Sequence, residues 1–352
     1  MYNILPKEIY YINHCIPFKS NSLSIDKELD SMSGNVGNTY IMYCISQILF
    51  GYIIDVNEIN GIANLFTEDL ENIDTEYINN NYKYVLINMQ DQLRTEISYY
   101  GNTDLRFKNI NIFLNKINIK IICFGLGSNC FNDENFNNII DELYDSQKEF
   151  IQILSNKSNK FSIRGKYTKE IMDKLNIKNY SMVGCPTFFI NNKKIIKKDI
   201  KKIVITGLFD WINQEQEEIT IMGCKIPRNV ELFYFCQDYN EIELINKKKI
   251  NNVNIVFLTN FEEISNFFKD KDLTFGYRVH ASIMSLNNGC LAICGNNDSR
   301  AKEMCELFKI PHICNYPNKS INEIINEIDI NLIEENYISL QKCHNDFLNE
   351  LF

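Results

Sequence analysis

The chain has 352 residues, more than one hydrophobic core ordinarily supports, so we expect two domains. Hydrophobic residues make up 45% and charged residues 23%, the balance of a soluble globular protein. The net charge of −9 excludes non-specific nucleic-acid binding as the main role, so no nucleic-acid partner is expected. No apolar run approaches the roughly 18–20 residues of a transmembrane segment. The start lacks the apolar core of a signal peptide, which predicts a cytoplasmic protein.

Apolar runs alternate with helical patterns along the chain. In chain order, the patterns predict a helix at Tyr40–Phe50, strands at Tyr84–Asn88 and Ile119–Phe124, helices at Asn135–Leu154 and Thr168–Leu175, strands at Ile203–Gly207 and Val230–Cys236, a strand at Asn254–Leu258 followed by a helix at Asn260–Phe268, and a strand at Cys290–Cys294 followed by a helix at Arg300–Phe308. The strands are almost continuously hydrophobic, which is typical of strands covered on both faces. This alternation predicts an α/β fold with mainly parallel sheets.

The domain boundary is expected within residues 191–202. Six lysines in this stretch indicate a solvated connector, although a basic rim beside a cleft is the alternative. The segment Ser320–Phe352 is predicted to be an amphipathic helix, because its isoleucines recur at helical spacing. We expect this helix to reach back toward the first domain.

The cysteines indicate neither a disulfide scaffold nor a metal site. There are 12 of them, and no two form a C-x-x-C pair. Cys290 and Cys294 are separated by an apolar strand, and their even spacing lets both face the core. We therefore expect buried thiols rather than zinc ligands, and we expect no metal.

Two motifs in the first half could bind a polar ligand. Ser33–Thr39 contains Gly34 and Gly37 directly before a predicted helix, whose first amides can bind an anion, although such turns are often mere connections. Arg164 lies just before a second helix and can present a bidentate fork to a carboxylate or phosphate. Thr168 is a plausible N-cap, which alone would explain part of this motif.

Two further motifs lie in the second half. Arg278 and His280 are two residues apart at the start of a predicted buried helix, where both could reach one site. Histidine suits proton transfer near neutral pH, although an isolated histidine can also be hydrogen-bonded in a turn. Residues 295–300 follow a strand at its carboxyl end, where open α/β sheets bind ligands. The alternative is that Asp298 or Ser299 simply caps the next helix.

Together these stretches resemble the polysaccharide pyruvyl transferase family. The resemblance rests on the ordered set Ser33–Asn38, Ser162–Arg164, Gly184–Pro186, Gly276–His280 and Asp298–Arg300, and it covers roughly residues 30–315. It implies two Rossmann-like domains facing each other across a cleft, the arrangement called GT-B. We place the N-terminal, acceptor-side domain at residues 1–195. The C-terminal, donor-side domain is then 196–352.

The sequence departs from the family pattern at three positions. Asn38 and Cys185 stand where many members have Asp, and Ala281 stands where Gly is common. The departures at Asn38 and Ala281 are tolerable substitutions. The resemblance indicates the reaction class better than it indicates the acceptor.

The resemblance implies transfer of a pyruvyl group from phosphoenolpyruvate to two hydroxyls of a sugar, forming a cyclic ketal. The expected partners are thus phosphoenolpyruvate and a sugar or polysaccharide precursor, with no cofactor beyond the donor substrate. The predicted donor-binding residues are Arg164, Arg278, Ser299 and Arg300, with Arg278 and His280 as the catalytic pair. The predicted acceptor or cleft residues are Gly34, Asn35, Gly37 and Asn38.

The residue types fit this chemistry independently of the resemblance. The carboxylate and phosphate of the donor need cations, which arginine forks supply. His280 is the best available general acid, and we expect its ring to be partly exposed in the cleft. Asp91 and Asp104 are candidates for a base. Two alternatives stay open: a GT-B glycosyltransferase that uses a nucleotide sugar, and a family member that binds glycan without catalysis.

Overall fold

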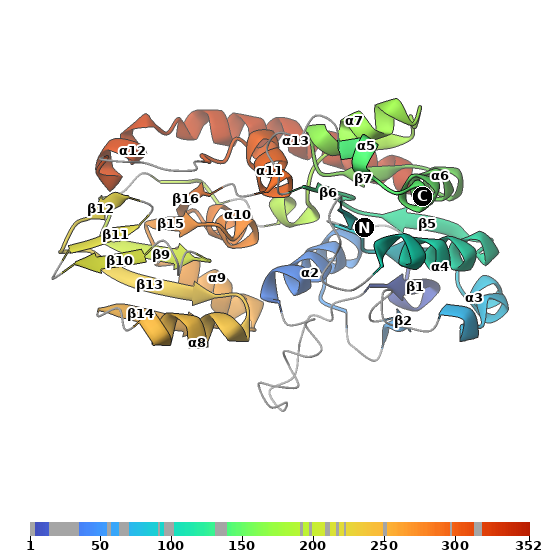
Figure 1. The fold of residues 1–352 in the computed structure, drawn as a ribbon, viewed down its shortest axis with the longest axis horizontal. Coiled ribbons are helices and arrows are strands. Elements are labelled where there is room, and N and C mark those ends of the chain that lie inside the picture. Colours follow the sequence, from blue (N-terminus) through green and yellow to red (C-terminus); the bar gives the residue numbers. More distant parts are fainter. Residues whose placement is uncertain are drawn as a thin grey trace.

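Two parallel sheets form the centres of two halves that lie side by side (Figure 1). The computed structural model describes residues 4–13, 35–54, 58–62, 70–90, 92–94, 102–130, 139–190, 193–196, 199–207, 212–215, 218–221, 223–248, 252–295, 298–312 and 319–352. Within these ranges, strands before residue 195 and strands after residue 196 pair only among themselves. The predicted α/β class with parallel sheets is confirmed.

The sheet of the first half has four parallel strands. Their order is β2 (Asn60–Ile62), β1 (Ile9–Ile12), β3 (Tyr84–Ile87) and β5 (Lys120–Cys123). In β3, Leu86 packs into one core cluster, whereas Val85 and Ile87 pack into another. Both faces are therefore covered, which explains the continuous hydrophobicity of these strands.

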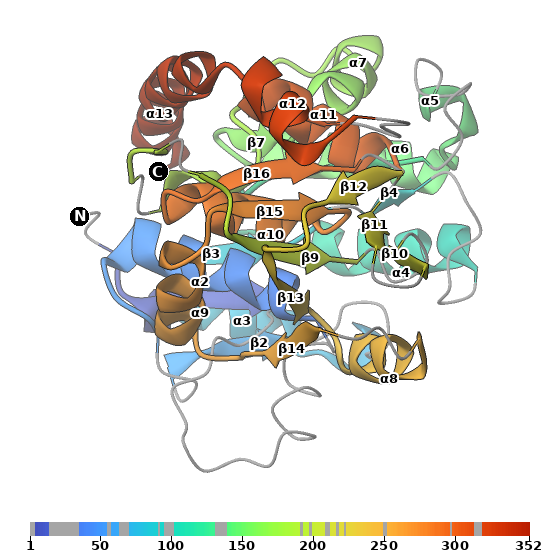
Figure 2. The same ribbon diagram turned by 90° about the vertical axis from the view of Figure 1, so that its left-hand side faces the viewer.

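The sheet of the second half has five parallel strands. Their order is β14 (Val253–Phe257), β13 (Glu231–Cys236), β9 (Lys202–Thr206), β15 (Leu273–Gly276) and β16 (Leu291–Cys294). Numbered along the chain, this is the order 3-2-1-4-5 of a Rossmann fold. Val204 packs with α9 (Phe261–Lys269) and α10 (Val279–Asn287) on one face, which Figure 2 shows beside the sheet.

Shorter elements complete the two halves. The remaining strands form two parallel pairs, β4 (Leu93–Arg94) with β6 (Ser128–Asn129) and β7 (Phe161–Ile163) with β8 (Tyr180–Met182), and one antiparallel sheet of β10 (Ile212–Glu215), β11 (Glu218–Ile221) and β12 (Cys224–Ile226). The remaining helices are α3 (Thr75–Asn81), α4 (Thr103–Lys116), α5 (Ile139–Glu142), α6 (Asp145–Lys157), α7 (Lys166–Lys174), α8 (Tyr239–Lys248) and α11 (Ser299–Phe308), with 3-10 turns η1 (Pro6–Glu8), η3 (Leu70–Asn72) and η5 (Pro186–Phe189).

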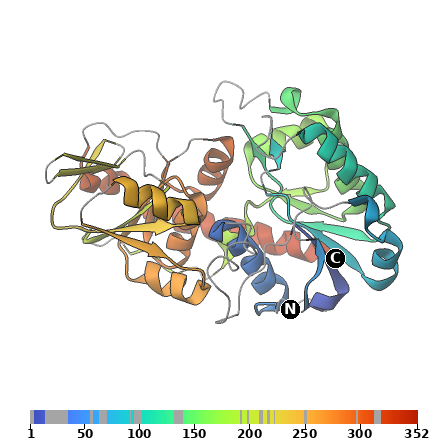
Figure 3. The same cartoon turned by 60° about the horizontal axis from the view of Figure 1, so that its bottom comes forward.

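Two helices join the halves. α2 (Val36–Phe50) precedes most of the first sheet in sequence, yet Val36, Tyr40 and Cys44 pack into the cluster around the second sheet. Figure 3 shows α2, in blue, between the two halves. α13 (Ile330–Leu351) follows α12 (Ile321–Glu327) and runs from the second half onto the first (Figure 1).

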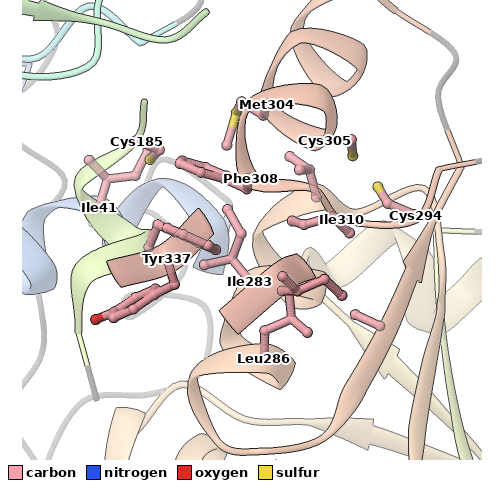
Figure 4. Packing of buried hydrophobic residues seen from close by; sticks show 14 of the residues in the cluster. Ile41, Cys185, Ile283, Leu286, Cys294, Met304, Cys305, Phe308, Ile310 and Tyr337 are labelled. Carbon is pink, nitrogen blue, oxygen red and sulfur yellow. The ribbon is translucent and has the colours of Figure 1, made fainter. Parts of the chain in front are cut away.

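Aromatic side chains fill the core between these helices. Phe308 of α11 stacks on Phe188 of η5 with ring centroids 3.8 Å apart. Figure 4 shows Phe308 near Cys185 and Met304, with Ile310 beside it. One hydrophobic cluster thereby includes strands of both sheets, so the halves share a core rather than meeting at a polar surface.

The structure differs from the sequence-based prediction at several elements. The segment 320–352 is two helices rather than one, because Asp329 caps a new helix by accepting a hydrogen bond from the Leu332 amide. The predicted helix at Asn135–Leu154 is α5 and α6, and its residues 135–138 lie outside the described ranges. β15, at Leu273–Gly276, was not predicted as a strand. None of the helices described has both the length and the hydropathy of a membrane span.

The packing of α13 on the first half predicts a large effect of Phe347→Ala. Phe347 is 1% exposed, and its ring contacts Phe124 edge to face at a centroid distance of 5.6 Å. We expect Phe347→Ala to lower the free energy of unfolding by about 3–5 kcal/mol, since the surrounding core cannot close the cavity. Urea denaturation measures this loss. Ile338→Ala is the matched control, because Ile338 is 67% exposed on the same helix and its loss should cost about 0.5 kcal/mol or less.

Candidate functional site

A cavity of about 300 Å³ lies between the two halves and contains most of the predicted site residues. The first half contributes Asn35, Asn38, Arg94 and Asn129. The second half contributes Gly207 after β9, Gln237 after β13, Tyr277, Arg278, Val279 and His280 after β15, and Asp298 and Arg300 after β16. Both halves are therefore needed to form this site.

Strand order explains the position of the cavity. In the second sheet, β9 and β15 are neighbours, and the chain continues to one side of β9 and then to the other. Open α/β sheets bind ligands at such a switch point, outside the carboxyl ends of the strands. Gly207 and Tyr277 directly follow the ends of these two strands.

The start of α2 forms one wall of the cavity. Asn35 caps the helix, and its side-chain oxygen accepts a hydrogen bond from the Gly37 amide at 2.8 Å. A Cβ at residue 37 would lie 2.9 Å from Nδ1 of His280, so only glycine allows this approach. Asn38 lines the cavity, whereas Gly34 lies outside the described residues.

His280 lies in the first turn of α10. Its ring is 7% exposed, so the expectation of a partly exposed ring is wrong. The cause is close packing between α2 and η5: Gly37 lies against Nδ1, and Sγ of Cys185 lies 3.8 Å from Nε2. The ring of this second-half residue is thus held in position by two residues of the first half.

Two carboxylates hold Arg278, which caps α10 at its N-terminus. Nε and Nη2 donate to Oε1 of Glu241 at 2.9 and 2.6 Å, and Nη2 donates to Oδ2 of Asp238 at 2.7 Å. Burial raises the pKa of Glu241 despite the neighbouring Arg278. Burial also acts against the charge of Arg278, but Glu241 and Asp238 raise the pKa of the guanidinium. The arginine is therefore charged and fixed in direction.

Arg300 and Asp298 line the wall formed by α11. The Asp298 side chain caps this helix by accepting from the Ala301 amide at 2.7 Å, and its other oxygen accepts from Nη2 of Arg300 at 3.2 Å. Asp298 therefore both caps α11 and lines the cavity. The side chain of Arg300 is 29% exposed.

Ser299 was predicted to bind the donor, but the structure places it in the junction between the halves. It is fully buried and is absent from the cavity lining. Its Oγ accepts from the Cys130 amide at 2.8 Å, and its own amide donates to the Cys130 carbonyl at 2.9 Å. The side chain satisfies a backbone group of the first half.

Arg164 and Asp104 also lie away from the cavity lining. Arg164 is 1% exposed, and its aliphatic stem packs against Gly127, where a Cβ would lie 2.6 Å from Cδ. Asp104 forms an ion pair with Lys108 at 2.7 Å on α4 and accepts from Ser146, which leaves it no role as a base in this site. Asp91 lies outside the described residues.

Glu303 of α11 is a buried carboxylate that interacts electrostatically with Arg164. Glu303 is 1% exposed and accepts hydrogen bonds from the amide and hydroxyl of Thr168 at 3.1–3.2 Å, so a carboxylate of the second half caps α7 of the first. Burial raises the pKa of Glu303 to about 8, although Thr168 and Arg164 act in the opposite direction.

The family model for polysaccharide pyruvyl transferase matches residues 35–299, three quarters of the chain. The chain belongs to this family. It is therefore a transferase of the class that modifies polysaccharides. A search of curated proteins gave no significant match.

Two solved structures match this chain at low identity. HepE from Anabaena, solved in complex with UDP and glucose, is 8% identical over 97% of this chain and 95% of its own, with a TM-score of 0.46. The glycosyltransferase SnogD from Streptomyces nogalater is 6% identical over 82% of this chain and 83% of its own, with a TM-score of 0.33. These values are too low to support an inference about substrates.

Sequence reasoning missed three polar residues that line the cavity: Arg94, Asn129 and Gln237. Gln237 directly follows β13, so its place after a strand was a usable signal. Arg94 and Asn129 lie on strands of two residues, where no periodicity exists to reveal them.

The contact between Gly37 and His280 predicts that Gly37→Ala will impair the transferase. The added methyl group must displace the imidazole, and small displacements of a reacting group can cost about 10²-fold in rate. We expect turnover to fall at least about tenfold. Stability should change little, because alanine favours the helix by up to about 1 kcal/mol. Turnover and urea denaturation are measured on the same preparation, and wild-type turnover in the variant would contradict the prediction.

The raised pKa of Glu303 predicts a pH-dependent stability. Between the ordinary value of 4.5 and about 8, the folded chain binds a proton that the unfolded chain releases. The free energy of unfolding should therefore fall as pH rises through this window, and Glu303→Gln should reduce the fall. Urea denaturation at pH 5 and pH 8.5 tests this.

Another buried group, His344, acts in the opposite sense. Burial lowers the pKa of His344 to about 4, which favours the folded state as pH rises toward 6.5. This contribution is common to wild type and Glu303→Gln and cancels in their difference. Equal pH dependence in both proteins would show that Glu303 does not titrate in the window.

Proposed function

We propose that this transferase moves a pyruvyl group from phosphoenolpyruvate to two hydroxyls of one sugar unit in a polysaccharide or glycan precursor, forming a cyclic ketal. The observation that carries the proposal is the cavity between the two halves, which is lined by Arg94, Arg278 and Arg300 together with the buried His280. This combination suits a small substrate with two anionic groups and one carbon that must be protonated.

The arginines supply directed contacts for the donor. Phosphoenolpyruvate carries a carboxylate and a phosphate, and planar guanidinium forks match the oxygens of both. Glu241 and Asp238 hold Nε and Nη2 of Arg278, while its Nη1 makes no hydrogen bond to any described residue. Nη1 is therefore the nitrogen that the donor would contact.

The reaction balances without a further reagent. His280 gives a proton to the methylene carbon, which becomes a methyl group and leaves cationic character on the neighbouring carbon. The first sugar hydroxyl attacks that carbon, and its proton passes to the neutral imidazole, which is thereby restored. The C–O bond to phosphate then breaks. The second hydroxyl closes the ring, and its proton goes to the departing phosphate, which leaves as hydrogen phosphate.

This scheme gives His280 two proton transfers, the first to the methylene carbon and the second from the first sugar hydroxyl. A general acid contributes about 10²–10⁴-fold in rate. Cys185 and Gly37 fix the ring between the two halves, so the imidazole needs no reorganisation when the substrates bind. Neither Asp91 nor Asp104 is required as a base.

The donor assignment is tested by binding and by product. Isothermal calorimetry should detect phosphoenolpyruvate and only weak binding of UDP-glucose. Incubation with phosphoenolpyruvate and a panel of glycosides should release phosphate and add to the sugar the mass of a pyruvate ketal. Tight UDP-glucose binding without a response to phosphoenolpyruvate would instead support a nucleotide-sugar transferase.

His280→Gln tests the general acid within the same assay. Glutamine fills much of the same space and forms hydrogen bonds but does not transfer protons at neutral pH. We expect turnover to fall at least about 10²-fold while phosphoenolpyruvate still binds. Near-normal phosphate release by the variant would remove His280 from the mechanism.

A further inference from the structure

Two amide side chains line the cavity and have unsatisfied polar atoms. Asn129 ends β6 in the first half, and Gln237 follows β13 in the second; each residue is 2% exposed. Oδ1 of Asn129 and Nε2 of Gln237 have no hydrogen-bond partner among the described residues. Each half of the chain thus contributes to the cavity lining one buried amide with an atom that no described residue satisfies.

The main chains of both residues are firmly held. Gln237 donates its amide to Oε2 of Glu241 at 2.7 Å, and its carbonyl accepts from Val36 at 2.9 Å. Asn129 is paired with Arg94 in the strand pair β4–β6. The unsatisfied side-chain atoms are therefore not explained by a poorly ordered main chain. They lower the stability of the free protein.

Other buried amides in the same protein are used structurally. Nδ2 of Asn111 donates to the Ser146 carbonyl at 2.9 Å, and Nδ2 of Asn287 donates to the Thr187 carbonyl at 2.7 Å. Both of these residues lie outside the lining of the cavity. Oδ1 of Asn111 is also unsatisfied, but its Nδ2 is bonded within the fold, whereas the side chains of Asn129 and Gln237 make no hydrogen bond to a described residue. This difference indicates that Asn129 and Gln237 serve a ligand.

We propose that Asn129 and Gln237 bind a hydroxyl-bearing edge of the acceptor sugar, one from each wall, and hold it beside the donor; this rests on the proposed function. The argument is one of hydrogen-bond type. The carboxylate and phosphate of phosphoenolpyruvate are acceptors and could satisfy only an amide N–H. An amide oxygen needs a donor, which a sugar hydroxyl supplies while also accepting from an N–H.

Rotation of a terminal amide exchanges its oxygen and nitrogen, but the conclusion does not depend on the rotamer. Each amide carries one acceptor and two donor hydrogens, so a ligand that satisfies both residues must donate as well as accept. A sugar diol does both. Its recognition from both walls requires the two halves to be in place together, as the cavity itself does.

The test uses near-isosteric apolar replacements, Asn129→Leu and Gln237→Met. Each variant should raise the KM for an acceptor glycoside at least about tenfold, because one hydrogen bond to a hydroxyl is lost, and should change the KM for phosphoenolpyruvate less than about twofold. Their melting temperatures should equal or exceed that of wild type, since a buried unsatisfied group is removed. Asn111→Leu is the matched control: it should lower the melting temperature and leave both KM values unchanged.

A binding measurement separates this proposal from the proposed reaction. Saturation-transfer NMR with methyl glucoside, methyl galactoside and methyl mannoside reports sugar binding without any turnover. Binding by wild type that both variants lose supports the sugar subsite even if phosphoenolpyruvate is never consumed. The subsite is overturned if wild type binds none of the three, if the variants bind as wild type does, or if the variants lose phosphoenolpyruvate binding instead.

Discussion

The attachment of α11 to the first half is the contact on which the site depends. Ser299 exchanges two hydrogen bonds with the backbone of Cys130, and one turn later Glu303 caps the start of α7. Residues four apart lie on one face of a helix, so this face faces the junction. Arg300, one residue beyond Ser299, points instead into the cavity. The helix that joins the halves therefore also supplies a wall of the pocket.

The charged groups of the cavity fix the orientation of two arginines and do not simply add positive potential. The chain is acidic overall, with a net charge of −9, yet three arginines and a histidine line this small space. Two of those arginines are bonded to carboxylates, Arg278 to Glu241 and Asp238 and Arg300 to Asp298. Each carboxylate reduces the local positive potential while fixing a guanidinium in place. Preorganised groups of this kind stabilise charge that develops during a reaction without reorganising.

The sequence predicts the second half of the site well. Arg300 follows the predicted apolar strand at Cys290–Cys294, so its position at the sheet edge could be inferred from the pattern. Arg278 and His280 were indicated instead by the buried helix that begins there. Arg164 and Ser299 also precede predicted helices, but both are buried outside the cavity lining, and Ser299 bonds to the backbone of the first half. A polar residue at a sheet edge serves a junction or a ligand equally well, and only the placement of the opposite half decides between them. Arg94 and Asn129 were hidden because two-residue strands carry no periodic signal.

α13 gives the molecule a mechanical property that neither sheet has by itself. At its start, Asn336 bonds to the Leu307 carbonyl of the second half, and at its end, Glu350 pairs with Lys160 of the first. With 22 residues, the helix is about 33 Å long and acts as one strut across both halves. Because its polar contacts with the two halves lie at different points along one rigid helix, moving the halves apart would break the contacts at one end of α13.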